Sequence, residues 1–435
     1  MVNIKREKNQ NKKLNYLWFM LINNNKLKMT SIEAQQYIDS LSKDILEIDL
    51  SKQNLTELPD LSRFTQLQEL YCDDNQLTSL PPNLPNSLQR LDCSNNELTS
   101  LPPLPNSLQY LNCNGNLLTL TSLLNLPNSL QELYCGYNRL TSLPDHLCCP
   151  HGPNNLQLLF CNRNQLTSLP DTLPNSLQIL SCSNNPLTSL PDILPNSLQQ
   201  LYCQYNRLTS LPPTLPNSLK ILNCHNNQLT SLDDHLPNSL QTLDCRWNNL
   251  TSLPPNLPNS LKVLFCWNNR LTSLPPNLPN SLQKLNCGYN QLTSLHDTLP
   301  NSLEELNCER NYLTSLPDHL CCPHRPHSLH RIVCNNNRLT YLPNNLPNSL
   351  NLLDVQHNKL TSLPNNLPNY LEYLFCYDNQ LTYLPDNLPN SLELFDCKFN
   401  PKIINKYPLL ENIGSILDKK KYIQEINWQF IKERA

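Results

Sequence analysis

The stretch that decides the fold reads Leu261-Lys-Val-Leu-Phe-Cys-Trp-Asn-Asn-Arg-Leu-Thr-Ser-Leu-Pro-Pro-Asn-Leu-Pro-Asn-Ser281. Near-copies of it recur along the chain, usually 21 residues apart. The period is counted on the asparagine of each Cys-x-x-Asn step, at Asn75, Asn96, Asn116, Asn138, Asn164, Asn185, Asn206, Asn227, Asn248, Asn269, Asn290, Asn311, Asn337, Asn358, Asn379 and Asn400. With one degenerate repeat around Ile48, the array comprises 17 repeats over residues 45–400. A fixed period of this length predicts a solenoid of stacked units.

The first half of each repeat has the pattern of a short strand. Leu261, Leu264 and Cys266 are placed to point inward, while the side chains between them point outward. Asn269 follows where the chain must leave the strand. Its amide can donate and accept, so stacked copies are expected to satisfy the turning backbone and each other.

The second half of the repeat refills the core and returns to the next strand. Leu271 and Leu274 supply apolar side chains, and Pro275, Pro276 and Pro279 follow. Proline removes amide donors and fixes φ, so this segment cannot be a regular helix or an inner strand. The sequence therefore predicts a horseshoe or superhelix with a parallel strand ladder on its concave side and a helix-free, polyproline-II-like convex side.

This pattern resembles that of leucine-rich repeat proteins. The short unit with Leu-Pro-x-x-Leu-Pro is similar to the repeats of bacterial effectors secreted into host cells, the class of Yersinia outer protein M and invasion-plasmid antigen H. The resemblance covers about 80% of the chain and differs in having Cys where many such repeats have Leu or Ala. It implies a protein-binding solenoid. The Asn-, Lys- and Ile-rich flanks are typical of an AT-rich genome, and we expect an amoebal giant virus as the source.

The flanks are expected to cap the array, because a solenoid end would otherwise expose its core to water. Residues 30–44 have the pattern of an amphipathic helix, and residues 401–435 predict a helical cap. Residues 1–29 form a basic and apolar extension that we interpret as disordered or unused, with residues 1–28 as an unused upstream start before Met29. Its apolar run over residues 14–22 is too short to span a bilayer.

Fifteen of the 19 cysteines occupy one repeat position, which the alternation predicts to be buried. They are Cys72, Cys93, Cys113, Cys135, Cys161, Cys182, Cys203, Cys224, Cys245, Cys266, Cys287, Cys308, Cys334, Cys376 and Cys397. Val355 and Leu50 fill the same slot elsewhere, so it suits a small or medium apolar group. Side chains in register point parallel, which disfavours disulfides between neighbours. Reduced thiols in this number favour a reducing compartment, so we expect a cytoplasmic location.

The remaining cysteines lie in two similar inserts in the two longest repeats. The candidate metal ligands there are His146, Cys148, Cys149, His151, His319, Cys321, Cys322 and His324. A zinc site needs about four such ligands in a tetrahedral array, whereas adjacent cysteines chelate one ion poorly. The inserts are therefore either a duplicated surface loop, which we favour, or a site for metal or redox chemistry. We expect no cofactor.

Charge and motifs exclude several function classes. The net charge of -3 gives no electrostatic case for a nucleic acid or an anionic membrane as partner. The invasion-plasmid-antigen H relatives join such repeats to a ubiquitin-ligase domain with a catalytic cysteine, but about 35 residues follow Asn400 and none is Cys. Scattered histidines form no repeated catalytic constellation. We expect no enzyme activity.

Aromatic and arginine side chains at outward positions suggest a protein-binding surface on the concave face. Trp247 and Trp267 are expected to share one outward position on adjacent strands, with Phe265 on the same side and all three clear of the core. The candidate residues are Tyr202, Tyr205, Arg246, Trp247, Phe265, Trp267, Tyr289, Tyr373, Phe375 and Tyr377. The alternative is drift on an exposed sheet, since isolated exposed aromatics are common.

The sequence therefore predicts a non-enzymatic solenoid that binds an unidentified protein partner in host cytoplasm. An adaptor that recruits a host ubiquitin or kinase complex through a cap is a second interpretation. A structural component of a particle, assembled through the convex face, is a third.

Overall fold

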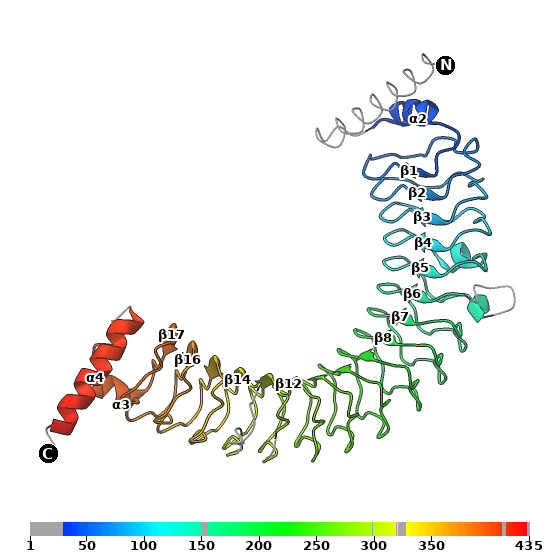
Figure 1. Cartoon of the computed structure of the whole chain (residues 1–435). Coiled ribbons are helices and arrows are strands. Elements are labelled where there is room, and N and C mark those ends of the chain that lie inside the picture. The colour runs from blue at the N-terminus through cyan, green and yellow to red at the C-terminus, as the bar shows by residue number, and fades with distance from the viewer. Residues whose placement is uncertain are drawn as a thin grey trace. The chain divides into compact units, whose positions relative to one another are not determined.

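The computed structural model describes residues 29–148, 155–297, 299–318, 320, 328–410 and 415–432. The chain divides into two compact units, an N-terminal unit over Met1–Asn185 and a C-terminal unit over Pro186–Ala435. Figure 1 shows the succession of short strands and loops, with helices near both ends of the described chain. The predicted repeat solenoid with a parallel strand ladder is confirmed.

Each repeat contributes one three-residue strand. The N-terminal unit holds β1 (Glu47–Asp49), β2 (Glu69–Tyr71), β3 (Arg90–Asp92), β4 (Tyr110–Asn112), β5 (Glu132–Tyr134), β6 (Leu158–Phe160) and β7 (Ile179–Ser181). The C-terminal unit holds β8 (Gln200–Tyr202), β9 (Ile221–Asn223), β10 (Thr242–Asp244), β11 (Val263–Phe265), β12 (Lys284–Asn286), β13 (Glu305–Asn307), β14 (Arg331–Val333), β15 (Leu352–Asp354), β16 (Tyr373–Phe375) and β17 (Leu394–Asp396). Within each unit, neighbouring strands pair in parallel and in step, as Val263 with Lys284 and Phe265 with Asn286.

The core lies behind the strands and is built almost entirely of leucine. In the repeat of β11, Leu261, Leu264 and Leu271 are fully buried, and Leu274 is nearly so. The middle residue of each strand points into this core, while its two neighbours are more accessible. Burying a leucine side chain contributes about 1.5–3 kcal/mol, so each repeat supports the next through apolar contact.

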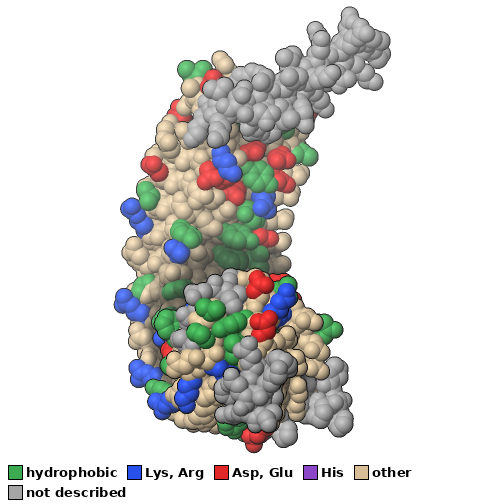
Figure 2. All heavy atoms as spheres, turned by 90° about the vertical axis from the view of Figure 1, so that its left-hand side faces the viewer, with side chains coloured by type: hydrophobic (Ala, Val, Ile, Leu, Met, Phe, Trp, Pro, Cys, Tyr) green, Lys and Arg blue, Asp and Glu red, His purple; other side chains and the backbone are tan. Residues whose placement is uncertain are grey.

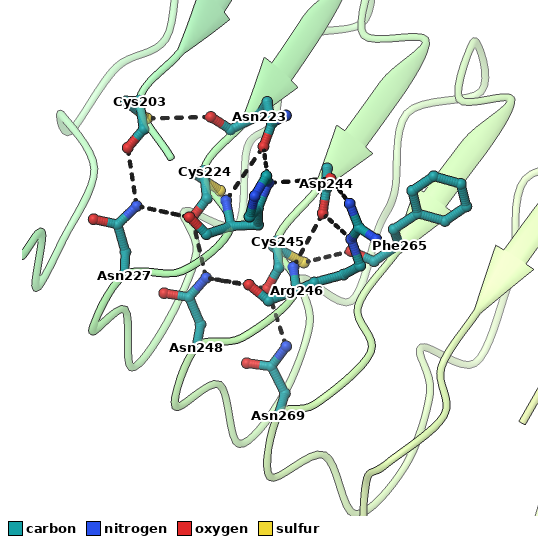
Figure 3. Close-up of polar contacts among 11 residues, drawn as sticks. Cys203, Asn223, Cys224, Asn227, Asp244, Cys245, Arg246, Asn248, Phe265 and Asn269 are labelled. Atoms are coloured by element: carbon teal, nitrogen blue, oxygen red, sulfur yellow. Dashed lines mark hydrogen bonds and ion pairs between the residues drawn. The ribbon is translucent and has the colours of Figure 1, made fainter. Parts of the chain in front are cut away.

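The ladder asparagine closes each strand by bonding to main chain. Asn248 Oδ1 accepts from the Leu229 amide at 2.9 Å, and its Nδ2 donates to the carbonyls of Cys224 and Cys245, both at 3.1 Å (Figure 3). The amide therefore joins its own repeat to the preceding one. All of these bonds join the Asn248 side chain to main-chain atoms. The expectation that stacked asparagine amides also bond to each other was wrong, because the turning backbone uses both the oxygen and the nitrogen of the amide.

The fifteen repeat cysteines are all buried and unbridged, as expected. Val355 and Leu50 are fully buried in the same slot. Burial raises the pKa of most of these thiols well above the ordinary value near 9, and Cys266 is one example. A thiol that stays protonated behaves as a small apolar side chain, which is what the slot requires.

The return segments are largely irregular, but two of them contain short 3-10 helices. These are η1 (Leu120–Leu123) and η2 (Asp145–Cys148). The prediction of a helix-free return was wrong at these two places. At η1 the repeat lacks the usual prolines, so the Ser122 amide is free to donate to the Thr119 carbonyl at 3.0 Å.

Three α-helices flank the array in the described chain. Helix α2 (Ser31–Ser40) begins with a capping box between Thr30 and Glu33, and it buries Ala34 and Ile38. Helices α3 (Pro401–Lys406) and α4 (Ile416–Lys432) follow the last repeat. No helix among the described residues combines the length and apolar character needed to cross a membrane.

Candidate protein-binding surface

Two rows of side chains form the accessible surface of the strand ladder. The first row, here called the strand face, comprises the outward residues one and three positions before each ladder cysteine and one position after it. The second, here called the turn row, is the residue two positions after that cysteine. Trp247 and Tyr289 belong to the turn row and have φ of 52° and 50°. The turn needs a left-handed residue because the chain reverses there between strand and asparagine.

Trp267 is the centre of an aromatic cluster in the C-terminal unit. Its ring lies 5.0 Å from that of Trp247 and 5.0 Å from that of Tyr289, edge-to-face in both cases. Arg310 places its guanidinium 4.9 Å from the Tyr289 ring centroid. Gly288 leaves room for this packing, because a Cβ there would lie 2.9 Å from Trp267 Cδ1.

One detail of the expected cluster was wrong. Trp247 stands in the turn row, in register with Asn268, whereas Trp267 is one position earlier in its repeat. The rings still meet, because neighbouring repeats are offset by only one strand spacing. Trp267 lies outside the repeat core, as expected, but its ring is not fully exposed. It is half-buried, and its Nε1 is buried without a hydrogen-bond partner among the described residues.

Arg246 is held by a buried carboxylate rather than lying free on the surface. Its Nε and one terminal nitrogen donate to Asp244 at 2.8 and 2.7 Å (Figure 3). His225 Nδ1 lies 3.3 Å from the same carboxylate and 2.6 Å from Asn223 Oδ1. Burial acts to raise the pKa of Asp244, but the hydrogen bonds from His225 and Arg246 outweigh it and lower that pKa.

This network presents the Arg246 guanidinium beside an aromatic ring. Its central carbon lies 5.3 Å from the centroid of Phe265. Tyr205 in the turn row packs edge-on against His225 at 5.0 Å. The structure thus brings Tyr205, Arg246 and Phe265 together through His225 and Asp244.

The second predicted group lies farther along the C-terminal unit. Tyr377 packs edge-on against His357 at 4.7 Å and against Phe399 at 5.4 Å. Tyr373 donates its hydroxyl proton to Glu393 Oε2 at 3.0 Å. Phe375 is half-buried on the strand face.

Tyr202 and Phe375 stand apart from the other predicted residues. In the part of the chain that the structure describes, neither makes a ring contact with them. Tyr202 donates to Gln200 Oε1 at 2.9 Å, within its own strand.

Sequence reasoning missed several members of these clusters, namely His225, Asp244, Arg310, His357 and Phe399. Three of them could have been found from the period, because Arg310, His357 and Phe399 share the turn row with Trp247. The roles of His225 and Asp244 depend on contacts between repeats, which the period alone does not show.

The predicted metal ligands remain untested. Cys149, His151, His319, Cys321, Cys322 and His324 lie outside the described residues, as do the side chains of His146 and Cys148 in η2. Among the residues that are described, no group of three or more His, Cys, Asp or Glu side chains could hold a metal ion.

Family models match several parts of the array. A model of paired leucine-rich repeats matches residues 196–238 and 259–301, and a single-repeat model matches residues 87–106, 176–196 and 239–259. The solved structure of YopM from Yersinia enterocolitica is 31% identical, with a TM-score of 0.63, covering 84% of this chain and 89% of that one. YopM from Yersinia pestis, a leucine-rich effector protein, is 32% identical with a TM-score of 0.64, covering 85% and 92%.

The chain belongs to the leucine-rich repeat family. Its repeats resemble those of YopM, as the sequence indicated. The functional domain of InlJ from Listeria monocytogenes, which includes a cysteine ladder, is 27% identical with a TM-score of 0.65, covering 73% of this chain and 69% of that one. No curated protein matches the chain. Leucine-rich repeat proteins generally act in protein–protein interaction, and such scaffolds are typically non-enzymatic.

Proposed function

We propose that this leucine-rich repeat protein is a non-enzymatic scaffold that binds a protein partner through the surface centred on Trp247, Trp267 and Tyr289. The observation that carries the proposal is the cluster of three rings, in which Trp267 lies 5.0 Å from both Trp247 and Tyr289. Trp247 and Tyr289 also hold φ near 50°. Left-handed backbone costs a bulky residue roughly 1–3 kcal/mol, whereas Asn tolerates it. Other repeats use asparagine at this place, as at Asn226 and Asn268. An aromatic ring here is therefore costly to folding, and partner binding gives a reason for it.

The exposure of the cluster supports the same conclusion. Trp247 is 47% exposed, so much of an apolar indole is left for a partner to cover. Large aromatic side chains are typical anchors of protein interfaces, and truncating such an anchor typically costs about 2 kcal/mol or more of binding. Trp267, which itself packs on Tyr289, holds the Trp247 ring in place, so a partner would lose little side-chain entropy on contact.

Arg246 supplies a polar element next to these anchors. Its bidentate pairing with Asp244 fixes the guanidinium plane, and its unpaired edge can donate to a carbonyl or carboxylate of a partner. We place this binding in the cytoplasm of a host cell, in keeping with the reduced thiol ladder and with a viral source. The partner would then be a host protein.

The test compares one substitution with a matched control. Partners captured from host lysate are identified, and the affinity of the purified partner is then measured for the full chain and two variants. Trp247→Asn should weaken binding at least about tenfold. Tyr137→Asn changes the same repeat position in the N-terminal unit, where Tyr137 also has positive φ and is exposed. It should leave the affinity within about twofold of the wild type.

Equal affinities of both variants would reject the proposed surface. Assembly of the purified protein into large homopolymers, with no partner bound, would instead favour a structural component of a particle.

A further inference from the structure

A second aromatic row crosses the strand face of the N-terminal unit. Tyr110 on β4, Tyr134 on β5 and Phe160 on β6 follow one another on adjacent strands. Tyr134 lies 5.4 Å from Tyr110, and it stacks on Phe160 at 4.9 Å with 14° between the planes. All three rings are half-buried, so each keeps part of its surface accessible to a partner.

Arg90 shows that the aromatic rings of this face can bind a guanidinium group. Its guanidinium carbon lies 3.4 Å from the Tyr110 ring centroid and 5.9 Å from that of Tyr71. Its Nε is buried without a hydrogen-bond partner among the described residues. The cation is therefore held by stacking on aromatic rings, an interaction that an arginine forms readily because its planar guanidinium is weakly hydrated.

The surroundings of the row are acidic. The strand face and turn row of β1 to β3 carry six carboxylates, Glu47, Asp49, Glu69, Asp73, Asp74 and Asp92, against two cations, Lys52 and Arg90. In the described part of this unit, the one ion pair joins Lys52 to Asp74 at 3.9 Å, and both side chains are largely exposed. Most of these carboxylates are therefore without a basic partner. Figure 2 shows red acidic side chains next to green hydrophobic ones on the upper part of the visible face.

Two further observations support a negative potential there. Burial first, and then the nearby Asp92 carboxylate, raise the pKa of Asp73. Burial, together with a hydrogen bond to Glu69, raises the pKa of Tyr71 to about 12. In both groups burial is the larger cause of the raised pKa, and the neighbouring Asp92 and Glu69 carboxylates add to it.

We propose that this face, from β1 to β6, binds an arginine-containing basic segment of another protein. A guanidinium of the partner would lie against the accessible part of the Tyr134 ring. The Tyr134 hydroxyl donates to Glu132 Oε2 at 3.1 Å, so a carboxylate lies beside that contact. Other cations of the segment would pair with Glu69 and Asp73. This second site lies entirely in the N-terminal unit, and its test is independent of the test of the surface around Trp267.

The probe is a synthetic peptide of alternating arginine and serine, with lysine and glutamate versions for comparison. Binding to the full chain is measured by calorimetry in about 50 mM and about 300 mM NaCl. The arginine peptide should bind most tightly, the lysine peptide several-fold more weakly and the glutamate peptide not at all. Salt should weaken binding about fivefold or more, because exposed charges are screened.

Paired variants locate the site. Tyr134→Ser introduces the residue that Ser181 supplies at the same repeat position, so the fold should tolerate it. It should remove the preference for arginine over lysine. Glu69→Gln combined with Asp73→Asn should weaken both peptides about tenfold. Glu304→Gln combined with Glu372→Gln makes the same charge change in the C-terminal unit and should have less than about twofold effect.

Three results would overturn the proposal. The first is an equal loss of peptide affinity in both double variants, which would mean that the peptide is attracted non-specifically by the charge of the protein. The second is an unchanged arginine preference in Tyr134→Ser. The third is a several-fold gain in affinity when Lys5, Arg6, Lys8, Lys12 and Lys13 are all replaced by serine in the full-length chain. That gain would identify the chain's own basic segment as the occupant in place of another protein.

Discussion

At the scale of single residues, several repeats have a turn-row residue that the local backbone conformation disfavours. The position needs φ near 50°, which Asn and Gly adopt at small cost. Several repeats follow this preference, as at Asn95, Asn184 and Gly115. Trp247 and Phe399 do not, and both leave large parts of their rings exposed.

The first prediction follows from this conflict. Trp247→Asn should keep the free energy of unfolding unchanged or raise it by about 1 kcal/mol, because relief of backbone strain offsets the lost contact with Trp267. Urea denaturation measures it. The control is Trp267→Ala, which should lower the free energy by roughly 1–3 kcal/mol because this ring packs on both sides. A large destabilisation by Trp247→Asn would mean that the indole serves folding rather than binding.

The ladder thiols give a second prediction at the residue scale, on the pH dependence of stability. Burial raises the pKa of Cys266 well above 9, so ionisation is easier in the unfolded chain. Its contribution is therefore complete below the unfolded pKa and is lost as pH rises above about 9. Cys266→Val should match the wild type at pH 7 and exceed it by about 1.4 kcal/mol at pH 10. Val355 shows that the slot accepts valine. Parallel stability curves for the two proteins from pH 7 to 10 would contradict the assigned burial.

At the scale of the repeat, the row of buried asparagine side chains helps to join each repeat to the preceding one. Each strand is only three residues long, and the ladder amides add side-chain bonds to the main-chain bonds that join one repeat to the next. The amide of Asn269, for example, accepts from Leu250 at 3.0 Å and donates to Cys245 and Cys266, each at 3.0 Å. Losing one amide therefore leaves a buried main-chain amide of the preceding repeat without its acceptor and removes one of two donors from two buried carbonyls.

The third prediction tests this role. Asn248→Ala should lower the free energy of unfolding by about 2–4 kcal/mol, because the buried Leu229 amide loses its acceptor and the carbonyls of Cys224 and Cys245 each lose one of their two asparagine donors. Asn249→Ala, one residue later and outside the ladder position, should cost less than about 0.5 kcal/mol. Chemical denaturation of both variants measures the two free energies of unfolding. Comparable losses of stability would contradict the proposed role of the asparagine ladder.

At the scale of the whole molecule, fifteen buried thiols make the chain a sensitive reporter of its own folding. Each belongs to a different repeat, so accessibility at any one of them reports opening of that part of the solenoid. Stacked repeats are stabilised by their neighbours, and opening is expected to begin at the ends.

The fourth prediction uses this property. Alkylation of the native protein at neutral pH, followed by mass spectrometry, should modify chiefly Cys148, Cys149, Cys321 and Cys322, since the ladder thiols are buried and protonated. Denaturant should expose the other fifteen. Among these, we expect Cys72 and Cys397, near the ends of the array, to react before Cys266. Rapid modification of ten or more cysteines in the native protein would contradict the buried ladder.

The sequence by itself determined the solenoid, its strands and its inside and outside. The 21-residue period places leucine, cysteine, asparagine and proline at the same positions in almost every repeat. Each repeat therefore favours the same backbone path, and few alternatives remain. Even the departure at η1 follows from missing prolines, although it was not anticipated.

Only the tertiary structure decided how side chains of different repeats meet. Trp267 touches Trp247 and Tyr289 across repeat boundaries, and Asp244 gathers His225 and Arg246 from its own repeat and the preceding one. The Tyr110–Tyr134–Phe160 row likewise exists only once the strands are side by side. The period fixes where a backbone position lies, but rotamers and burial depend on neighbours about 20 residues away in the sequence, which local patterns do not specify.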